Sequence, residues 1–294
     1  MTQRIAYFDC FSGAAGDMLL AALLDAGLPL DDLRHDLARM PVEGYELVLE
    51  PAQQHGITGS RFDVLDIDVG ERPARNLTLI REILQDTDLP EPVVANSLRV
   101  FTRLGTAEAR IHGVELDEVH FHEVGAIDAL VDIVGFCIAL ERMGIERVYA
   151  SPLPLGSGVV RTEHGLLPVP APATLALLAD VRAPVLPSEA RGELVTPTGA
   201  AILSTLATFQ RPAMQVEQVG YGFGRKEFAW PNMVRVWIGV AIENAPHGPR
   251  PIDAHTHDHG HGHSHDRGHG HDHGHTHDHD HGHAHPHDHG HEHA

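Results

Sequence analysis

Hydrophobic and polar positions along the chain follow two periods, which together predict a mixture of strands and helices. Alternating or short apolar runs indicate β-strands, and they cover residues 4–11, 44–52, 60–70, 214–224 and 232–242. Helical periodicity or long apolar runs cover residues 16–27, 31–40, 76–84, 92–110 and 127–144, with shorter helices near Ala173 and Ala200. Gly27 is expected to end the first helix, because glycine readily adopts the backbone conformation of a helix C-terminus. The order of these elements predicts the α/β fold class, with a mixed α+β arrangement as the alternative.

The hydrophobic pattern stops before the end of the chain. We expect one body over residues 1–244, with two subdomains (about 1–148 and 149–244) as an alternative, then a Pro/Gly linker over 245–254. The tail, 255–294, has no hydrophobic residue larger than alanine or proline, so it cannot offset the entropy of ordering and is predicted to be disordered. A purification tag is the alternative interpretation, but tags are short histidine runs, whereas this tail is long and interspersed with aspartate.

Charge and cysteine content narrow the class of partner. The formal net charge is −20 over 294 residues, and an acidic body disfavours nucleic acid and anionic membrane as partners while suiting cations. Cys10 and Cys137 lie in apolar surroundings and are expected to be reduced thiols. The N-terminal stretch has no long apolar run, and no segment has the roughly 20 apolar residues of a membrane span. We therefore expect a cytoplasmic protein.

The tail is itself a candidate metal reservoir. It contains 19 of the 26 histidines, and neutral imidazole is a good ligand for nickel, copper and zinc. With two to four imidazoles per ion, the tail would hold roughly five to nine ions. The candidate ligands that begin it are His255, His257, His259, His261 and His263.

Residues 117–132 combine histidines and acids at an unusual density for this chain. If 119–122 is extended, His120 and His122 project from one face, and Glu123 turns the chain toward a helix. On that helix Asp128 and Asp132 share one face, yet the helix is apolar nearly all round and is expected to be buried. Buried carboxylates need a partner or a metal, so this stretch predicts a divalent transition-metal site. The alternative is two ordinary hydrogen-bonded histidines and an Asp128 that caps the helix.

A second candidate site lies where the first strand leads into the first helix, over residues 8–18. Small residues allow close approach of a ligand, and a helix N-terminus offers free N–H groups for an anion. The spacing matches neither a Walker A loop nor a dinucleotide fingerprint. A tight turn with Asp17 as helix cap is the alternative. The candidate residues are Asp9, Ser12, Gly13, Gly16 and Asp17.

Two further stretches offer groups for a phosphate or carboxylate. In 192–203, Thr196 and Thr198 precede a helix, with Thr198 expected as its N-cap, and Glu193 has no evident helical role. Upstream, His164 lies in a loop stiffened by three spaced prolines.

A glycine-rich stretch near the end of the body carries a basic pair. Arg225 and Lys226 follow three spaced glycines and form the only adjacent Arg–Lys pair in the acidic chain. Such a pair suits a phosphate or carboxylate. A glycine bulge with a solvated pair of charges is the alternative.

The order of these motifs resembles one family. "YFDCFSGAAGDM", "FHEVGAIDALVDIVG", "SPLPLGSG", "HGLLPVPAPAT", "GELVTPTGAAIL" and "GYGFGRKEF" followed by "PNMVRV" are similar to the LarC family over about residues 1–241. The resemblance implies insertion of nickel into pyridinium-3,5-bisthiocarboxylic acid mononucleotide, which makes the nickel-pincer cofactor of lactate racemase with one carbon–nickel and two sulfur–nickel bonds. It also implies a lyase-type metal insertase, a nickel cyclometallase or chelatase, that consumes CTP with magnesium or manganese.

Roles for the candidate residues follow from that resemblance. The His/acid stretch would handle nickel, and the helix N-termini and basic pair would hold the anionic groups of the mononucleotide. A base must accept the ring proton that nickel replaces, and Glu123 or His122 would serve. Members of the family continue into a second, CTP-binding half, in whose place this chain has the histidine tail. We expect either a separate chain that supplies this half or a nickel chaperone or store without catalysis of its own.

Overall fold

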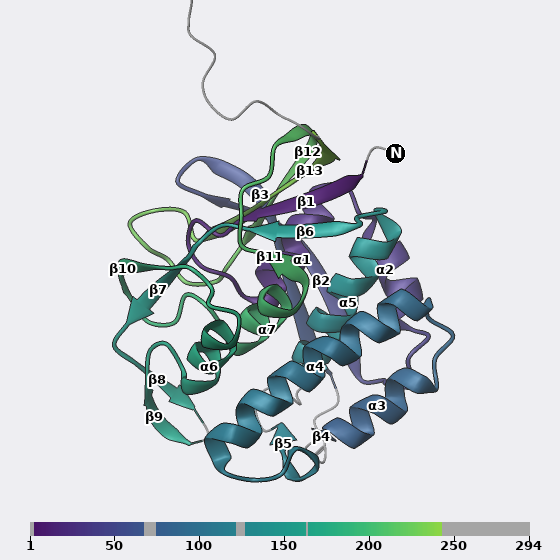
Figure 1. Ribbon diagram of the computed structural model, residues 1–294. Coiled ribbons are helices and arrows are strands. Elements are labelled where there is room, and N and C mark those ends of the chain that lie inside the picture. Colours follow the sequence, from purple (N-terminus) through teal and green to yellow (C-terminus); the bar gives the residue numbers. More distant parts are fainter. Residues whose placement is uncertain (1–2, 68–74, 122–126, 163, 243–294) are drawn as a thin grey trace, which may run out of the picture. The chain divides into compact units, whose positions relative to one another are not determined.

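Seven strands form one mixed sheet, in the order β11-β6-β1-β13-β12-β3-β2 (Figure 1). The computed structural model describes residues 3–67, 75–121, 127–162 and 164–242, with the backbone alone at 120–121. The bounds of the seven strands are β1 Arg4–Asp9, β2 Tyr45–Gln54, β3 Ile57–Asp66, β6 Arg147–Ala150, β11 Ala207–Thr208, β12 Met214–Phe223 and β13 Met233–Ala241.

The first strand of the chain lies in the middle of the sheet. β1 pairs in parallel with β6 and antiparallel with β13. β13 continues as an antiparallel pair with β12, whose other edge meets β3 in parallel. β2 and β3 form a hairpin at the edge of the sheet. Segments from both ends of the chain therefore build one sheet, and β1 is the strand that joins them.

The helices gather below the sheet in the view of Figure 1. α1 packs against β12, β3 and β13, and α5 and α7 contact α1. α4 packs in turn against α5, α6, α7 and α3. Their bounds are α1 Gly16–Asp25, α2 Leu30–Leu37, α3 Leu77–Gln85, α4 Glu91–His112, α5 Ile127–Arg142, α6 Pro172–Asp180 and α7 Pro197–Leu206.

Glycines in β12 set the distance between α1 and the sheet. A Cβ atom at Gly222 would lie 2.0 Å from the Met18 carbonyl oxygen, and one at Gly220 would lie 2.1 Å from that of Ala22. Both glycines are therefore required for this close approach. The contact brings the first turn of α1 against β12 and so positions the site described below.

One hydrophobic core joins the helices to the inner face of the sheet. Phe8 of β1 and Phe136 of α5 are buried, with ring centroids 5.5 Å apart. α5 is buried over most of its length, as its apolar sequence predicts. One carboxyl side chain on this helix, that of Asp132, is buried as well.

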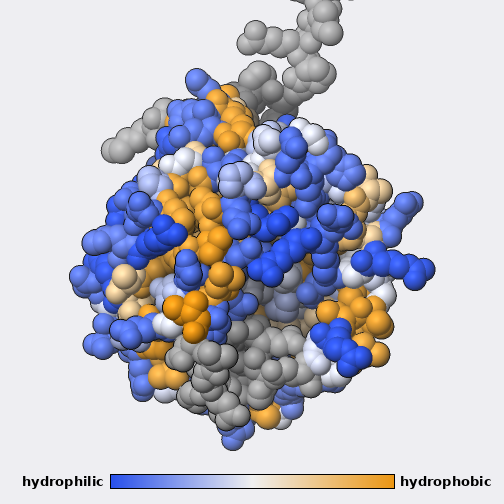
Figure 2. Space-filling view, turned by 180° about the vertical axis from the view of Figure 1, so that it is seen from behind, coloured by the Kyte–Doolittle hydropathy of each residue, from blue (hydrophilic) through white to orange (hydrophobic). Residues whose placement is uncertain are grey.

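The opposite face of the sheet carries aromatic and basic side chains. The rings of Tyr7 and Trp237 lie 5.1 Å apart, edge to face, and the Arg211 guanidinium lies 4.7 Å from the centre of the Trp237 ring. On the molecular face shown in Figure 2, hydrophilic side chains alternate with separate hydrophobic patches. No helix in the described ranges is both long and apolar enough to span a membrane.

Short elements complete the described chain. They are the two-stranded pairs β4 Arg75–Asn76 with β5 His120–Phe121, β7 Leu153–Ser157 with β10 Val185–Arg191, and β8 Val159–Thr162 with β9 Gly165–Pro168, and the 3₁₀ turn Leu116–Glu118.

The predicted elements are confirmed, as is the α/β fold class. Each predicted strand and helix is present, and the ends differ by at most a few residues. α1 ends as expected, because Ala26 occupies its C-terminal cap and Gly27 follows with φ +115°. The body, linker and tail boundaries stay a prediction, since residues 243–294 lie outside the described part.

Candidate functional site

Four aspartates from three elements gather at the beginning of α1. Asp17 belongs to the first turn of α1, Asp128 and Asp132 to the first half of α5, and Asp63 to β3. The other three are close enough to Asp132 for their charges to raise its pKa. The sequence predicted three of these four as site residues but assigned them to two separate sites.

Asp132 is the most deeply buried of the four, with 8% of its surface exposed. The backbone N–H of Asp17, at the start of α1, partly offsets the rise in the pKa of this carboxyl group. Its Oδ1 atom is buried and has no hydrogen-bond partner among the described residues. A buried carboxylate oxygen without a partner is costly, so Asp132 marks a position where a proton or a cation would be stabilising.

Gly16 makes this arrangement possible. A Cβ atom at this position would lie 2.5 Å from Oδ2 of Asp132 and 2.8 Å from Cγ2 of Thr198. Only glycine lets α5 and α7 approach the start of α1 so closely. The N-terminus of α1, where the sequence predicted an external anion, is thus already occupied by a carboxylate of the chain itself.

The carboxyl cluster has unusual proton affinities. Burial, followed by the charges of Asp17 and Asp128, raises the pKa of Asp132 well above its ordinary value. Burial also raises the pKa of Asp17 to about 6, with the charges of Asp63 and Asp128 contributing. Perturbed carboxyl groups of this kind are typical of functional sites. Both carboxyl groups of the Asp17–Asp132 pair therefore hold a proton more readily than an ordinary aspartate does.

Asp63 and Arg225 close one side of the cluster. The Arg225 guanidinium donates to Oδ1 of Asp63 from Nε at 2.9 Å and from Nη2 at 2.5 Å. The sequence analysis did not predict Asp63 as a site residue. In a strand of alternating polarity, an acidic residue is equally typical of a position that faces solvent. Arg225 is 64% exposed, so it faces both the cluster and the solvent.

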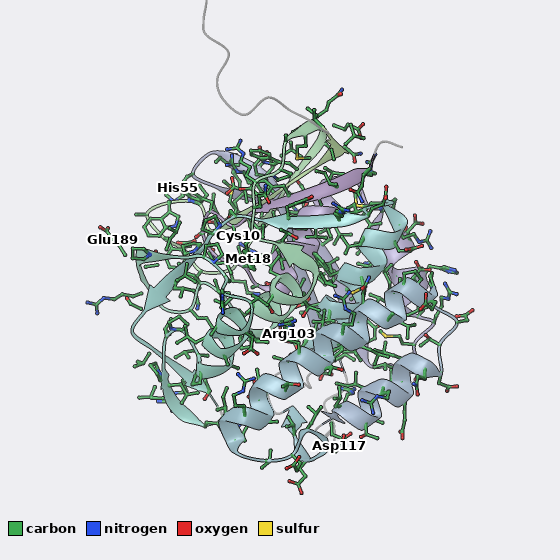
Figure 3. All side chains as sticks on the ribbon, in the orientation of Figure 1. Cys10, Met18, His55, Arg103, Asp117 and Glu189 are labelled. Carbon is green, nitrogen blue, oxygen red and sulfur yellow. The ribbon has the colours of Figure 1, made fainter. Side chains whose placement is uncertain are left out.

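The small-residue loop is held by the segment before α7. Gly13 has φ +108°, and a Cβ atom there would lie 2.0 Å from the Leu194 carbonyl oxygen. The Ala14 N–H donates to that oxygen at 2.9 Å, and the Thr196 N–H donates to the Ala14 carbonyl at 3.0 Å. Cys10 and Met18, labelled in Figure 3, bracket this loop in the interior. The sequence predicted that a ligand would approach this loop closely. In the structure, the backbone of the segment before α7 makes that approach.

Other candidate groups of this region bind partners within the chain. Ser12 is buried and its hydroxyl oxygen accepts from Trp230 Nε1 at 3.0 Å. Lys226 Nζ donates to the Glu193 carbonyl oxygen at 3.1 Å. Lys226 is therefore held against the segment before α7, which also supports the loop.

The N-cap predicted for α7 was wrong by two residues. The helix begins at Pro197, and the Thr196 hydroxyl oxygen accepts from the Gly199 N–H at 3.2 Å. Proline is favoured at the first helical position, so the cap falls on the residue before it. Thr198 instead lies inside the first turn, with its methyl group toward Gly16.

Two predicted residues lie apart from the cluster. Asp9 is paired in register with Arg235 and forms an ion pair with it. It shares a sheet face with Tyr7 and Trp237, whereas Phe8 points to the helices, so Asp9 is on the face opposite the helices. His164 lies between β8 and β9, where its ring contacts that of His112.

The predicted nickel ligands can be placed only in part. The backbone of His120 pairs with Asn76 in the β4–β5 ladder. The other predicted ligands before α5 and in the tail lie outside the described residues. They are His122, Glu123 and the tail histidines, including His255, His257, His259, His261 and His263. Within the described ranges, no three His, Cys, Asp or Glu side chains already converge on a point where they could hold a metal ion.

Comparison with known proteins points to one family. The family model described as "Nickel insertion protein" matches residues 6–268. A protein of Roseiflexus castenholzii whose name also refers to nickel insertion is 52% identical over 80% of this chain and 59% of its own length. The pyridinium-3,5-bisthiocarboxylic acid mononucleotide nickel insertion protein of Desulfitobacterium hafniense (strain DSM 10664 / DCB-2) is 48% identical, over 81% of this chain and 58% of its own length.

The matches cover most of this chain but a smaller share of each relative. The chain spans about three fifths of the length of these curated relatives. No solved structure matches the chain. The matched region includes α1, β3 and α5, the three elements that carry the four aspartates. The chain belongs to the nickel insertion protein family.

Proposed function

We propose that this chain inserts nickel into pyridinium-3,5-bisthiocarboxylic acid mononucleotide and does so at the Asp17–Asp132 cluster. Family membership and the printed name of the Desulfitobacterium relative support the substrate. The observation that carries the choice of site is the buried Oδ1 of Asp132, which has no hydrogen-bond partner in the described chain.

The reaction needs a proton acceptor. When nickel replaces a hydrogen on the pyridinium ring, the C–H electron pair becomes the carbon–nickel bond and one proton leaves. The two thiocarboxylate sulfurs supply the other bonds to the metal. Asp17 has a pKa of about 6 and that of its neighbour Asp132 is raised well above the ordinary value, so this carboxyl pair is suited to take up that proton.

The carboxyl cluster also suits the approach of the divalent substrate ion. Asp17 and Asp128 lie on the more accessible side of the cluster, and Asp132 forms its buried floor. We assign His120, His122 and Glu123, which precede α5 along the chain, to hold nickel during insertion, with Asp128 fixing an imidazole N–H. Mixed nitrogen and oxygen ligands suit nickel.

The basic pair is the candidate anchor for the mononucleotide. Arg225 is already held by Asp63, so its guanidinium is oriented while its outer side faces solvent. A phosphate or carboxylate of the substrate would share that guanidinium through further N–H donors. Lys226, held at the Glu193 carbonyl, adds a second positive charge.

Several features of the complete reaction belong to the same proposal. The family resemblance implies the use of CTP with magnesium or manganese and a separate CTP-binding half. It also implies a lyase-type classification and transfer of the cofactor to lactate racemase. The greater length of the relatives supports a further functional part in those proteins. The histidine tail would raise the local nickel concentration by tethering.

A second candidate function is nickel storage or delivery without catalysis. It is favoured by the 19 histidines of the tail. Storage requires stoichiometric binding and leaves the mononucleotide unchanged, whereas insertion converts it to a product that contains nickel and has lost one ring hydrogen.

The test is to incubate the full chain with nickel and the dithiolated mononucleotide, with and without CTP, and to analyse the product by mass spectrometry. Asp132→Asn should lose product formation. Asp36→Asn is the matched control, because Asp36 is also a buried carboxylate but is paired with Arg142. If neither protein forms product even when a CTP-binding half from a relative is added, storage is the better assignment. Equal product from Asp132→Asn and its parent would refute the site.

A further inference from the structure

An open groove of about 480 Å³ lies where α4 passes the ends of α6 and α7. Asp180 is the last residue of α6, and Thr205 belongs to the last turn of α7. None of the residues that line the groove belongs to the four-aspartate cluster, so the groove is a separate feature of the body. Its other polar side chains come from the middle of α4 and are those of Arg99, Thr102, Arg103 and Thr106.

The groove is positively charged, although the chain as a whole carries a formal net charge of −20. Arg99 and Arg103 are four positions apart, so they are neighbours on one face of α4, with about 5–6 Å between their Cβ atoms. Asp180 is the one carboxylate among the described residues that line the groove, and it is already paired with Arg110, whose Nη1 lies 2.9 Å from its Oδ1. The charges of Arg99 and Arg103 therefore dominate the groove.

The two arginines are held differently. Arg99 donates from Nη1 to Oδ1 of Asn96 at 2.9 Å and from Nη2 to the Thr205 carbonyl oxygen at 3.3 Å. These bonds orient its guanidinium at the junction of α4 and α7. Arg103, labelled in Figure 3, is half-buried and has no hydrogen-bond or ion-pair partner in the described ranges. Its N–H donors are thus available to a ligand.

A hydroxyl group beside the arginines also lacks a partner. Thr205 Oγ1 is buried and makes no hydrogen bond to the described residues, whereas the Thr106 hydroxyl donates to the Thr102 carbonyl oxygen at 2.7 Å. Buried polar atoms are rarely left without a partner. An acceptor oxygen bound in the groove would lie beside this hydroxyl and beside the free guanidinium of Arg103.

We propose that this groove binds a small phosphate-bearing anion through Arg99 and Arg103. Guanidinium groups donate paired N–H bonds to phosphate oxygens, and two of them one helical turn apart match a ligand with several anionic oxygens. The volume of about 480 Å³ is in the range of small-molecule sites. The groove therefore has room for a diphosphate or for the organic part of a phosphate ester.

A neighbouring cavity shows why the anion is assigned to this groove. That cavity is larger, about 650 Å³, and Arg99 also lines it, together with Arg147. Two glutamates, Glu141 and Glu146, line it as well. Their charges balance those of the two arginines, so the larger cavity does not select for an anion.

The test is isothermal titration calorimetry of the full chain at pH 8 with EDTA and at constant ionic strength. The imidazoles of the tail are neutral at this pH, and the chelator removes metal ions that would themselves bind phosphate. The titrants are pyrophosphate, ribose 5-phosphate and, as the uncharged counterpart, ribose. Binding of pyrophosphate alone would assign an inorganic diphosphate, and binding of ribose 5-phosphate but not ribose would assign a phosphate ester. Binding of neither anion would overturn the proposal.

Arg103→Gln should weaken binding about tenfold or more, the loss expected for one charge-assisted contact. Asp180→Asn should strengthen binding, because it removes the carboxylate that faces the groove, and a gain of affinity cannot come from misfolding. Arg191→Gln, at an exposed arginine of β10, is the matched control and should bind as the parent does.

Asp132→Asn should also bind the anion like the parent, so failure of this site and failure of the site proposed for nickel insertion are separate outcomes. Equal binding by Arg103→Gln and its parent, an equal loss in Arg191→Gln, or no gain in Asp180→Asn would each overturn the proposal.

Discussion

The backbone of Gly16, the first residue of α1, lies so close to Asp132 on α5 that a Cβ atom on this glycine would be 2.5 Å from Oδ2 of Asp132. This close contact joins two helices that the sequence assigned to different sites. It places one carboxylate oxygen at a helix N-terminus, where negative charge is favoured. The other oxygen is left without a partner in the described chain.

The first prediction concerns stability. The folded state raises the pKa of Asp132, so the folded protein binds this proton more readily than the unfolded chain does. The contribution of Asp132 to the free energy of unfolding therefore falls as pH rises from the unfolded-state pKa toward the folded-state pKa. Asp132→Asn should therefore raise the melting temperature at pH 8, by about 2–4 °C for each kcal/mol gained. The gain should shrink toward pH 4. Calorimetry at both pH values would decide, and a lower melting temperature at pH 8 would contradict the prediction.

The second prediction concerns catalysis. Asp17→Asn and Asp132→Asn should each lower the rate of nickel insertion by roughly 10²–10⁴-fold, the usual contribution of a proton-transfer group. In the parent protein the rate should fall as pH drops below the Asp17 pKa of about 6, since a protonated pair cannot accept another proton. Single-turnover product formation between pH 5 and 8 measures both effects. A rate that is flat across this range would exclude the pair as proton acceptor.

The third prediction concerns the histidines before α5. His122→Ala should abolish insertion at any nickel concentration, because a ligand of fixed position is removed, and His120→Ala should weaken nickel binding by the body. Asp128→Asn should have a smaller effect, about 10–100-fold, since it would act through an imidazole. Nickel titration of a chain lacking residues 253–294, with and without the mononucleotide, measures these effects. If both histidine variants bind nickel and form product like the parent, they are not ligands.

The fourth prediction separates the tail from the reaction. Deletion of residues 253–294 should remove most of the nickel that the chain binds in equilibrium dialysis, because 19 of its 26 histidines are lost. Insertion at saturating nickel should survive, since the tail sequence specifies no fixed coordination geometry. Loss of insertion even in excess nickel would show that the tail takes part in the reaction.

The fifth prediction concerns an ion pair that supports α5. Asp36 on α2 accepts from Nε and Nη2 of Arg142 at 2.7 and 2.9 Å. These hydrogen bonds lower its pKa, so the stabilisation is present above the ordinary carboxyl pKa and is lost as pH falls through the lower folded value. Asp36→Asn should cost about 1.5–3 kcal/mol at pH 7 and less at pH 3.

Urea unfolding at the two pH values checks this effect. Asp31→Asn is the control, because the Asp31 side chain is 90% exposed and its pair with Arg34 is worth little. An equal loss of stability at pH 3 and pH 7 would show that the effect does not come from the ionised pair.

Periodicity along the chain was enough to predict the secondary structure. The apolar helix at α5, the alternating strands β3 and β13, and the glycine that ends α1 depend on neighbours a few residues away, so local sequence carries them. The same local pattern showed that Asp132 would be buried without enough local partners. The composition of the tail likewise excludes a packed core without reference to the rest of the chain.

The membership of the site was decided by tertiary structure. Asp63 joins Asp17 and Asp132 because β3 lies beside β12, and because Gly222 lets α1 rest on β12. Asp9, only eight positions from Asp17, is directed to the other face of the sheet, where β13 brings Arg235 to it. His112 and His164 likewise meet only through folding. The period of a strand or helix tells which side chains share a face, but the partner of each face is set by contacts between distant segments.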